Sequence, residues 1–152
     1  MTELLAKDIM TKKVITISKD ATLAELANLL MKNKISGVPV IDEEKKLIGV
    51  VSEADIIVKK SSLPLPLSFS FAFLDKYENY TKSTKDFLNI RVEEIMSEDL
   101  KTTSEDITVN KVVNTMINNN INRLPVLNSN NKLVGIITRA DIMKSMIKEN
   151  KR

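Results

Sequence analysis

Apolar positions over residues 1–60 change their spacing in a regular order, which predicts a mixed α and β fold. After Thr22, leucine and alanine recur every three or four residues, which is the spacing of one face of a helix. Two later apolar runs have the length of strands, and a polar turn separates them. The predicted elements, in order, are a helical turn over 6–10, a strand over 14–17, a helix over 23–33, strands over 37–41 and 47–51, and a helix over 53–60.

The same order returns in the second half of the chain at a constant distance of 86 positions. Gly49–Ile56 has the form Gly-x-x-Ser-x-x-Asp, and Gly135–Ile142 has the form Gly-x-x-Thr-x-x-Asp. An internal repeat in one register indicates two copies of one structural unit. We therefore divide the chain into a first repeat over 1–60, a connector over 61–90 and a second repeat over 91–152.

Each repeat is too short to bury much surface alone. We therefore expect an α+β fold in which two pseudo-symmetric β-α-β-β-α repeats pack through their sheets and share one core. Such an arrangement would leave clefts between the two halves.

Capping residues and one proline add detail to the predicted helices and strands. Thr22 and Glu25 have the pattern of a capping box, whereas Thr108 is followed three residues later by Lys111 and predicts a weaker cap. Pro39 lacks an N–H group, so it fits either an edge strand or a place where the sheet is interrupted.

Glycine stands at matching places in the two repeats, at Gly49 and Gly135. A glycine within a strand indicates a backbone that another group approaches closely. Tight packing of the strand on a helix is the plainer explanation, and both alternatives stay open.

The connector differs from the repeats because it holds all the aromatic residues of the chain. They are Phe69, Phe71, Phe73, Tyr77, Tyr80 and Phe87. Prolines make the segment before them extended or irregular. The spacing of the later aromatic residues favours a helix over about 69–80, although Phe69, Phe71 and Phe73 also alternate as in a strand. This much aromatic surface is unfavourable in water. It could cover the core as a lid or form a subunit interface, and we expect a mixture of both.

The composition narrows the classes of function. The chain is 43% hydrophobic and 28% charged, and no apolar run approaches the ~20 residues of a membrane span. Its first residues show no basic and apolar leader, so we expect a cytoplasmic protein without a membrane partner. Cysteine and histidine are absent, which removes disulfides, thiolate metal sites and the commonest general base. We therefore expect neither a metal nor a catalytic cofactor, and no enzymatic activity.

The charge gives weak evidence on macromolecular partners. The net charge is +3 and the isoelectric point is near 9.0, a value that nucleic-acid-binding proteins often exceed. Lysines and acidic residues are interspersed, however, which is typical of a solvated surface. We therefore do not expect nucleic acid as a partner.

Each repeat resembles a cystathionine β-synthase (CBS) domain, and the pair resembles the tandem known as a Bateman module. The matching motifs are Asp8-Ile9-Met10 and Glu94-Ile95-Met96, the runs 35–40 and 121–126, and the two Gly-x-x-Ser/Thr-x-x-Asp motifs. The resemblance covers nearly all of the chain except the connector. It implies a regulatory sensor that binds AMP, ADP, ATP or S-adenosylmethionine in clefts between the repeats. It also implies a homodimer, and a chain with no other domain would signal to a regulated protein in trans.

The resemblance also implies which residues bind the ligand, because each family cleft combines residues of both repeats. A carboxylate can accept hydrogen bonds from the two ribose hydroxyls, and a hydroxyl beside free N–H groups at a helix start suits a phosphate. The first cleft would use Asp141 for ribose, Thr138 for phosphate or ribose, Ile136 as a base wall, Asn122 and Arg123 for phosphates, and Ile15, Ile35 and Ser36 around the base. The second cleft would use Asp55, Ser52, Val50, Ser36, Gly37, Lys101 and Ile121.

Two questions stay open at the level of the sequence. The Ser/Thr-x-x-Asp pattern is also an ordinary capping box, and the chain could be a structural or adaptor dimer whose clefts are vestigial. The two clefts also differ, since Arg123 matches Gly37 and Arg139 matches Glu53. A guanidinium forms charge-assisted bonds to phosphate, so we predict tighter nucleotide binding at Asp141, unless Arg123 only makes a surface ion pair.

Overall fold

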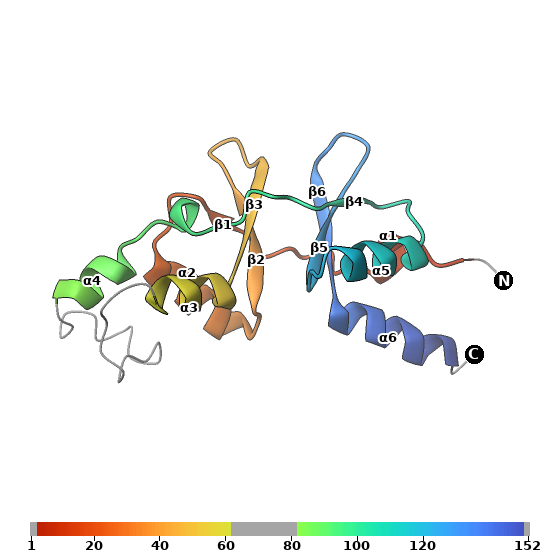
Figure 1. Ribbon diagram of the computed structural model, residues 1–152. Coiled ribbons are helices and arrows are strands. Elements are labelled where there is room, and N and C mark those ends of the chain that lie inside the picture. The colour runs from red at the N-terminus through yellow and green to blue at the C-terminus, as the bar shows by residue number, and fades with distance from the viewer. Residues whose placement is uncertain (1–2, 62–81, 151–152) are drawn as a thin grey trace. The chain divides into compact units, whose positions relative to one another are not determined.

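The protein is seen in a computed structural model that describes residues 3–61 and 82–150 (Figure 1). The chain folds into two compact units, and each is built from parts of both repeats. Unit 1 contains the residues up to Ile15 and those from Lys101 onward, and unit 2 runs from Thr16 to Leu100. The predicted helix over 69–80 lies outside the described residues.

Unit 1 has one three-stranded sheet with the order β4-β5-β6, in which β4 is parallel and β6 antiparallel to the central strand. Its elements are α1 (Ala6–Ile9), β4 (Thr103–Ser104), α5 (Val109–Asn118), β5 (Arg123–Leu127), β6 (Leu133–Thr138) and α6 (Arg139–Asn150). The core of this unit is made of Ala6, Val112, Met116, Leu124, Val126 and Ile137.

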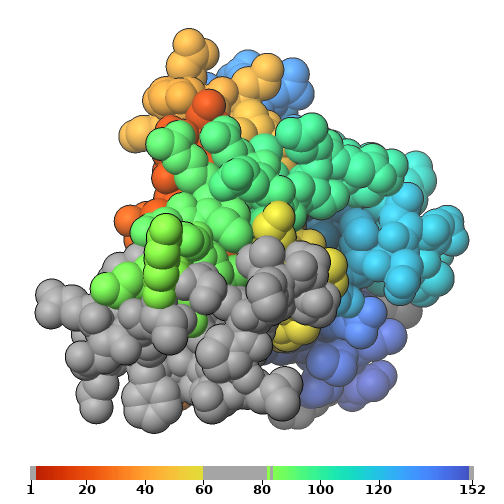
Figure 2. Space-filling model, turned by 60° about the vertical axis from the view of Figure 1, so that its left-hand side comes forward, coloured from red at the N-terminus to blue at the C-terminus, as the bar shows by residue number. Residues whose placement is uncertain are grey.

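Unit 2 repeats this plan with a sheet of the order β1-β2-β3. Its elements are β1 (Ile17–Ser18), α2 (Leu23–Asn33), β2 (Gly37–Ile41), β3 (Leu47–Ser52), α3 (Glu53–Ser61), α4 (Lys82–Leu88) and the 3₁₀ helix η2 (Val92–Glu94). The segment that holds α4 and η2, in green in Figure 2, lies over red and orange residues of the same unit. The backbone bonds Val92 N–H to Ala21 O and Glu93 N–H to Lys19 O fix it there.

These elements confirm the mixed α and β fold class and most of the predicted boundaries. The Thr22–Glu25 capping box forms as expected, with Glu25 N–H donating to the Thr22 hydroxyl at 3.2 Å and Thr22 N–H donating to the Glu25 carboxylate at 3.3 Å. Thr108 accepts only from Lys111 N–H, at 3.4 Å, so its cap is the weaker one. Among the described residues, no helix is long and apolar enough to cross a membrane.

The predicted strand over 14–17 is wrong for its first three residues. The observed strand is Ile17–Ser18, which pairs in parallel with Val40 and Ile41. The next position on β2 is Pro39, which has no N–H group to offer a neighbouring strand. The pairing therefore stops there, and Pro39 lies where the sheet is interrupted, in a central strand rather than an edge strand. Pro125 has the same place in unit 1, because β4 begins opposite Val126.

The helix α4 was not predicted, although its apolar residues explain it. Phe87 is 1% exposed and Leu88 is 0% exposed, so this end of the connector packs into the core of unit 2. The covering role that we expected for the aromatic connector therefore holds at Phe87. The other five aromatic residues lie outside the described part of the chain.

Candidate functional site

The site in unit 1 is built at the junction where β6 runs directly into α6. Thr138 ends the strand and Asp141 lies in the first turn of the helix. The Thr138 N–H and hydroxyl donate to Oδ2 of Asp141, at 2.9 and 3.2 Å. Asp141 is only 9% exposed, so the helix start holds a carboxylate that is almost buried and satisfied by its own turn.

A second part of the chain reaches the same carboxylate from far away in the sequence. The Thr11 hydroxyl lies 3.1 Å from Oδ1 and 3.4 Å from Oδ2 of Asp141. Its backbone pairs with the edge of β6, because Thr11 N–H donates to Ile136 O at 2.9 Å and Ile136 N–H donates to Thr11 O at 3.0 Å. We call residues 4–11, which bring Thr11 here, the first lead-in segment.

Met10 explains why glycine stands at position 135. A Cβ atom added to Gly135 would overlap the Met10 sulfur and lie 2.7 Å from its Cγ. The close approach that the sequence predicted is therefore made by a side chain of the protein itself. Because position 135 has no side chain, Met10 can pack directly on β6, next to the backbone pairing of Thr11 with Ile136.

Unit 2 has the same construction with residues 90–97 as the second lead-in segment. Ser52 N–H and its hydroxyl donate to Oδ2 of Asp55, at 2.9 and 3.3 Å. Ser97 pairs with the backbone of Val50, through bonds of 2.9 and 3.1 Å. A Cβ added to Gly49 would lie 2.8 Å from the Met96 sulfur and 2.9 Å from the carbonyl oxygen of Ser97.

The two carboxylates differ in how many donors they already accept. Asp141 accepts from Thr138 on Oδ2 and from Thr11 on both oxygens. Asp55 is half-buried and accepts only from Ser52, on Oδ2; no described residue donates to its Oδ1. A carboxylate offers about four acceptor positions. Asp141 has three donors, which are the Thr138 N–H, the Thr138 hydroxyl and the Thr11 hydroxyl, so about one position stays free. Asp55 has two donors, so it has the greater free capacity.

The neighbouring strands place further predicted residues beside these junctions. Arg123 is the register partner of Thr138, and Gly37 is the register partner of Ser52. A cationic side chain therefore stands next to the helix start in unit 1, where unit 2 has no side chain at all. This difference supports the predicted preference of the Asp141 site for phosphate.

The other predicted ligand residues are divided between the units. Unit 1 contains Ile15, Lys101, Ile121, Asn122, Arg123, Ile136, Thr138 and Asp141. Unit 2 contains Ile35, Ser36, Gly37, Val50, Ser52 and Asp55. Within each unit the hydroxyl and carboxylate of the Ser/Thr-x-x-Asp motif come together as predicted.

Sequence reasoning missed Thr11 and the two methionines as neighbours of the site. Asp8-Ile9-Met10 and Glu94-Ile95-Met96 were noted only as matching motifs, and each is followed by a hydroxyl residue. A hydroxyl at the same place in both repeats, after an apolar turn, was a signal that could have been used. Its partner could not be found, because Thr11 and Asp141 are 130 positions apart.

The groups at the two junctions can recognise a ligand through hydrogen bonds and charge. Each junction offers a carboxylate, a hydroxyl and, in unit 1, a guanidinium on the adjacent strand. In residues 3–61 and 82–150, no three His, Cys, Asp or Glu side chains are grouped to hold a metal ion. The groups present suit a ligand with vicinal hydroxyls and an anionic part.

Comparisons with known proteins agree with the repeat and the motifs. The family model of the CBS domain matches residues 6–61 and 92–148. Protein MJ1426 of Methanocaldococcus jannaschii is 37% identical over 155 residues, which cover 95% of this chain and 92% of that protein. Inosine-5'-monophosphate dehydrogenase of the same organism is 32% identical over 91% of this chain. The match covers only 23% of the dehydrogenase.

Solved structures show the same architecture. The CBS domain pair of protein MJ0100, in complex with 5'-methylthioadenosine and S-adenosyl-L-methionine, has a TM-score of 0.74 and 28% identity, and the match covers 97% of this chain and 99% of that one. CBSX2 from Arabidopsis thaliana has a TM-score of 0.76 and 22% identity, with 99% of both chains covered. The chain therefore belongs to the CBS domain family and contains a tandem pair of CBS domains.

Proposed function

We propose that this protein is a non-catalytic regulatory module that binds an adenosine-containing ligand and signals to a separate protein. The observation that carries the proposal is the paired Ser/Thr and Asp at both strand-to-helix junctions. The MJ0100 domain pair, which holds two adenosine compounds, supports the ligand class. Regulation of a partner in the cytoplasm by a homodimer remains a prediction.

In the proposed complex the ribose hydroxyls donate to the carboxylate of Asp141 or Asp55. Asp141 keeps the bonds that it accepts from the Thr138 N–H and hydroxyl, and it accepts a ribose hydroxyl on the position that remains. Thr138 and Arg123, which are register partners on β6 and β5, would bind a phosphate or another anionic group. The family resemblance further implies that residues of the other repeat frame the base, and this completion of the site is part of the proposal.

Titration calorimetry with AMP, ATP and S-adenosylmethionine tests the proposal directly. Asp141→Asn keeps the shape of the side chain but removes the charge that strengthens a hydrogen bond. Because hydrogen bonds to charged groups contribute about 1.5–3 kcal/mol, we expect affinity at that site to fall about tenfold to a hundredfold. Asp55→Asn should lower the affinity of the second site. We expect AMP and ATP to depend more on Asp141 than on Asp55.

Asp86→Asn is the matched control, because it removes an exposed carboxylate on α4, away from both junctions. It should bind all three ligands as the unchanged protein does. If the unchanged protein binds none of them, the sensor function is wrong. Equal losses from Asp141→Asn and Asp55→Asn for every ligand would contradict the difference between the sites.

A structural or adaptor protein with vestigial sites is the second candidate. It is favoured by one observation, namely that both carboxylates already form the hydrogen bonds of ordinary helix caps. A ligand that binds only the folded state raises the melting temperature. A melting temperature that none of the three ligands changes, together with a stable dimer, would favour the adaptor.

A further inference from the structure

The two carboxylates leave different numbers of hydrogen-bond positions open to a ligand. On Asp141 about one position stays open, because two donors of Thr138 and the hydroxyl of Thr11 occupy the others. On Asp55 about two stay open, because only the N–H and the hydroxyl of Ser52 are bound, and both lie on Oδ2. The oxygen Oδ1 is therefore shared with the protein in unit 1 and open in unit 2.

This difference comes from one residue of each lead-in segment. The backbones of Thr11 and Ser97 pair with β6 and β3 in the same way, at Ile136 and at Val50. The Thr11 hydroxyl reaches Asp141, whereas Ser97 is exposed and forms no side-chain hydrogen bond within the described part of the chain. Threonine is β-branched, so its side chain has fewer favourable rotamers than that of serine. The third donor is thus a feature of unit 1 alone.

The exposure of the two carboxylates follows the same difference. Asp141 is 9% exposed, and Asp55 is half-buried. A vicinal diol presents two hydroxyl groups side by side, so it needs two open acceptor positions and enough open surface to reach them. Asp55 meets both requirements, whereas Asp141 has room for about one hydroxyl.

Positive charge is distributed in the opposite way. Arg123 is the register partner of Thr138, and the corresponding partner of Ser52 is Gly37, which has no side chain. A guanidinium forms strong, charge-assisted hydrogen bonds with phosphate and carboxylate groups. Unit 1 therefore offers more to the anionic part of a ligand, and unit 2 offers more to its sugar.

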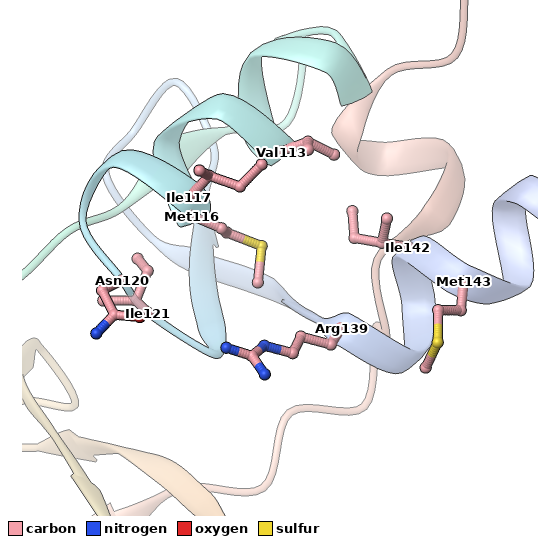
Figure 3. A pocket seen from close by; sticks show the side chains of 8 residues that line it. All are labelled: Val113, Met116, Ile117, Asn120, Ile121, Arg139, Ile142 and Met143. Atoms are coloured by element: carbon pink, nitrogen blue, oxygen red, sulfur yellow. The ribbon is translucent and has the colours of Figure 1, made fainter.

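A second arginine next to Thr138 belongs to a different surface. Arg139 lines an apolar groove of about 620 Å³ between α5 and α6. In Figure 3 its side chain extends toward the end of the groove where Asn120 and Ile121 lie. Neither Thr138 nor Asp141 lines this groove. The cationic group that we assign to the ligand site of unit 1 is therefore that of Arg123, on the adjacent strand.

We propose that the two sites select their ligands by different parts of the molecule, an inference that rests on the proposed binding of adenosine compounds. The Asp55 site requires both ribose hydroxyls, because Asp55 accepts a hydrogen bond from each. The Asp141 site accepts one ribose hydroxyl and depends on the anionic group that Arg123 binds. It therefore also takes a deoxynucleotide that lacks the other hydroxyl, whereas the Asp55 site rejects deoxyribose compounds.

Titration calorimetry on the full chain with AMP, 2'-deoxy-AMP and 3'-deoxy-AMP tests the proposal. Asp55→Asn weakens one site so that the Asp141 site can be measured, and Asp141→Asn does the reverse. Loss of a hydrogen bond to a charged group lowers affinity about tenfold to a hundredfold. We expect this loss at the Asp55 site with both deoxy compounds. At the Asp141 site we expect at least one of them to bind within about threefold of AMP.

The results separate this inference from the proposed function. If AMP binds but both deoxy compounds lose affinity at both sites, the ligand displaces the Thr11 hydroxyl and the inference is overturned, while the proposed function stands. The inference is also overturned if Asp141→Asn abolishes AMP binding, or if the Asp55 site keeps its affinity for either deoxy compound. If neither AMP, ATP nor S-adenosylmethionine binds the unchanged chain, the proposed function is wrong and the inference falls with it.

A matched pair of variants tests the role of the third donor, each made in the chain that carries Asp55→Asn. Thr11→Val opens a second position on Asp141, so the deoxy compound that binds like AMP should then bind at least about threefold more weakly than AMP. This ratio compares two ligands on one variant, so a change in the affinity for AMP itself does not affect it. Thr11→Ser keeps the donor and should keep the original ratio. An unchanged ratio in Thr11→Val would overturn the proposal.

Discussion

Single residues distinguish the two carboxylates, and the Thr11 hydroxyl is the clearest case. It fixes Oδ1 of Asp141 from the first lead-in segment, whereas no described residue donates to Oδ1 of Asp55. If adenosine ligands bind at Asp141, Thr11→Val should lower their affinity there, because the carboxylate loses the donor that orients it. One hydrogen bond contributes about 0.5–1.5 kcal/mol, so we expect a loss of about twofold to tenfold in calorimetry.

Two control variants, Thr11→Ser and Ser97→Ala, show whether Thr11 acts through its hydroxyl. Thr11→Ser keeps the donor and should bind as the unchanged protein does. Ser97→Ala removes the hydroxyl at the corresponding place in unit 2, where no bond to Asp55 is made, and should leave affinity unchanged. A loss of affinity in Thr11→Ser as large as in Thr11→Val would show that packing, and not the hydroxyl, is responsible.

The part of the site that the sequence could predict is the part formed within four residues. Thr138 and Asp141 meet because a strand that enters a helix brings the residue before the helix next to its first turn. The approach of Thr11 depends on how the first lead-in segment crosses β6, which no local pattern records. The same holds for Met10. The glycine at position 135 indicated a close approach to β6, but the sequence did not show which residue makes it.

At the scale of elements, substitution of Gly135 and Gly49 tests how closely each lead-in segment packs on its strand. Gly135→Ala and Gly49→Ala should each destabilise the fold by about 1–3 kcal/mol, as overpacking does. The obstacles at position 135 are side-chain atoms of Met10, but position 49 also faces the backbone carbonyl of Ser97. Combining each change with truncation of the methionine, by Met10→Ala or Met96→Ala, measures this difference.

Urea denaturation of the single and double variants gives the coupling energy of each pair. We expect a coupling of at least about 1 kcal/mol between positions 135 and 10, because truncating Met10 removes most of the obstruction. Coupling between positions 49 and 96 should be smaller, since the Ser97 carbonyl remains. Equal coupling in the two pairs would mean that the backbone at position 97 moves aside.

Elements were predicted well where they depend on neighbouring residues and poorly where they depend on distant partners. The helix over 23–33 and both antiparallel strand pairs carry their own period, caps and turns. The strand over 14–17 looked continuous, but its length is set by the missing N–H of Pro39 on another strand. The helix α4 was overlooked because the aromatic residues before it drew the predicted helix toward 69–80.

At the scale of the whole molecule, the two lead-in segments are exchanged between the repeats. Ala6 N–H donates to Ile107 O at 2.7 Å, and Val92 N–H donates to Ala21 O at 2.8 Å. These bonds correspond at the repeat distance, so the exchange is reciprocal. The constant register of the sequence revealed two repeats but not this exchange, because the register is the same whether a lead-in segment packs on its own repeat or on the other one.

The exchange of the lead-in segments predicts which fragments of the chain fold on their own. A fragment of residues 101–152 lacks Ala6, which is 0% exposed in the core of unit 1, and Met10, which covers Gly135. We expect this fragment to be largely unfolded, because unit 1 then loses buried contacts and the backbone partners of β6. Adding residues 3–15 after residue 150 through a short flexible linker restores every segment of unit 1 in a permuted order.

The permuted unit is feasible because the two ends to be joined lie close together. Leu4 and Asp8 line one pocket with Lys148 and Glu149, the last turn of α6. Circular dichroism and urea denaturation should show a cooperative transition for the permuted unit and none for residues 101–152. The same permuted unit with Thr11→Pro, which removes the N–H that bonds to Ile136 O, should lose stability. If residues 101–152 fold cooperatively alone, the first lead-in segment is dispensable and the exchange does not stabilise the fold.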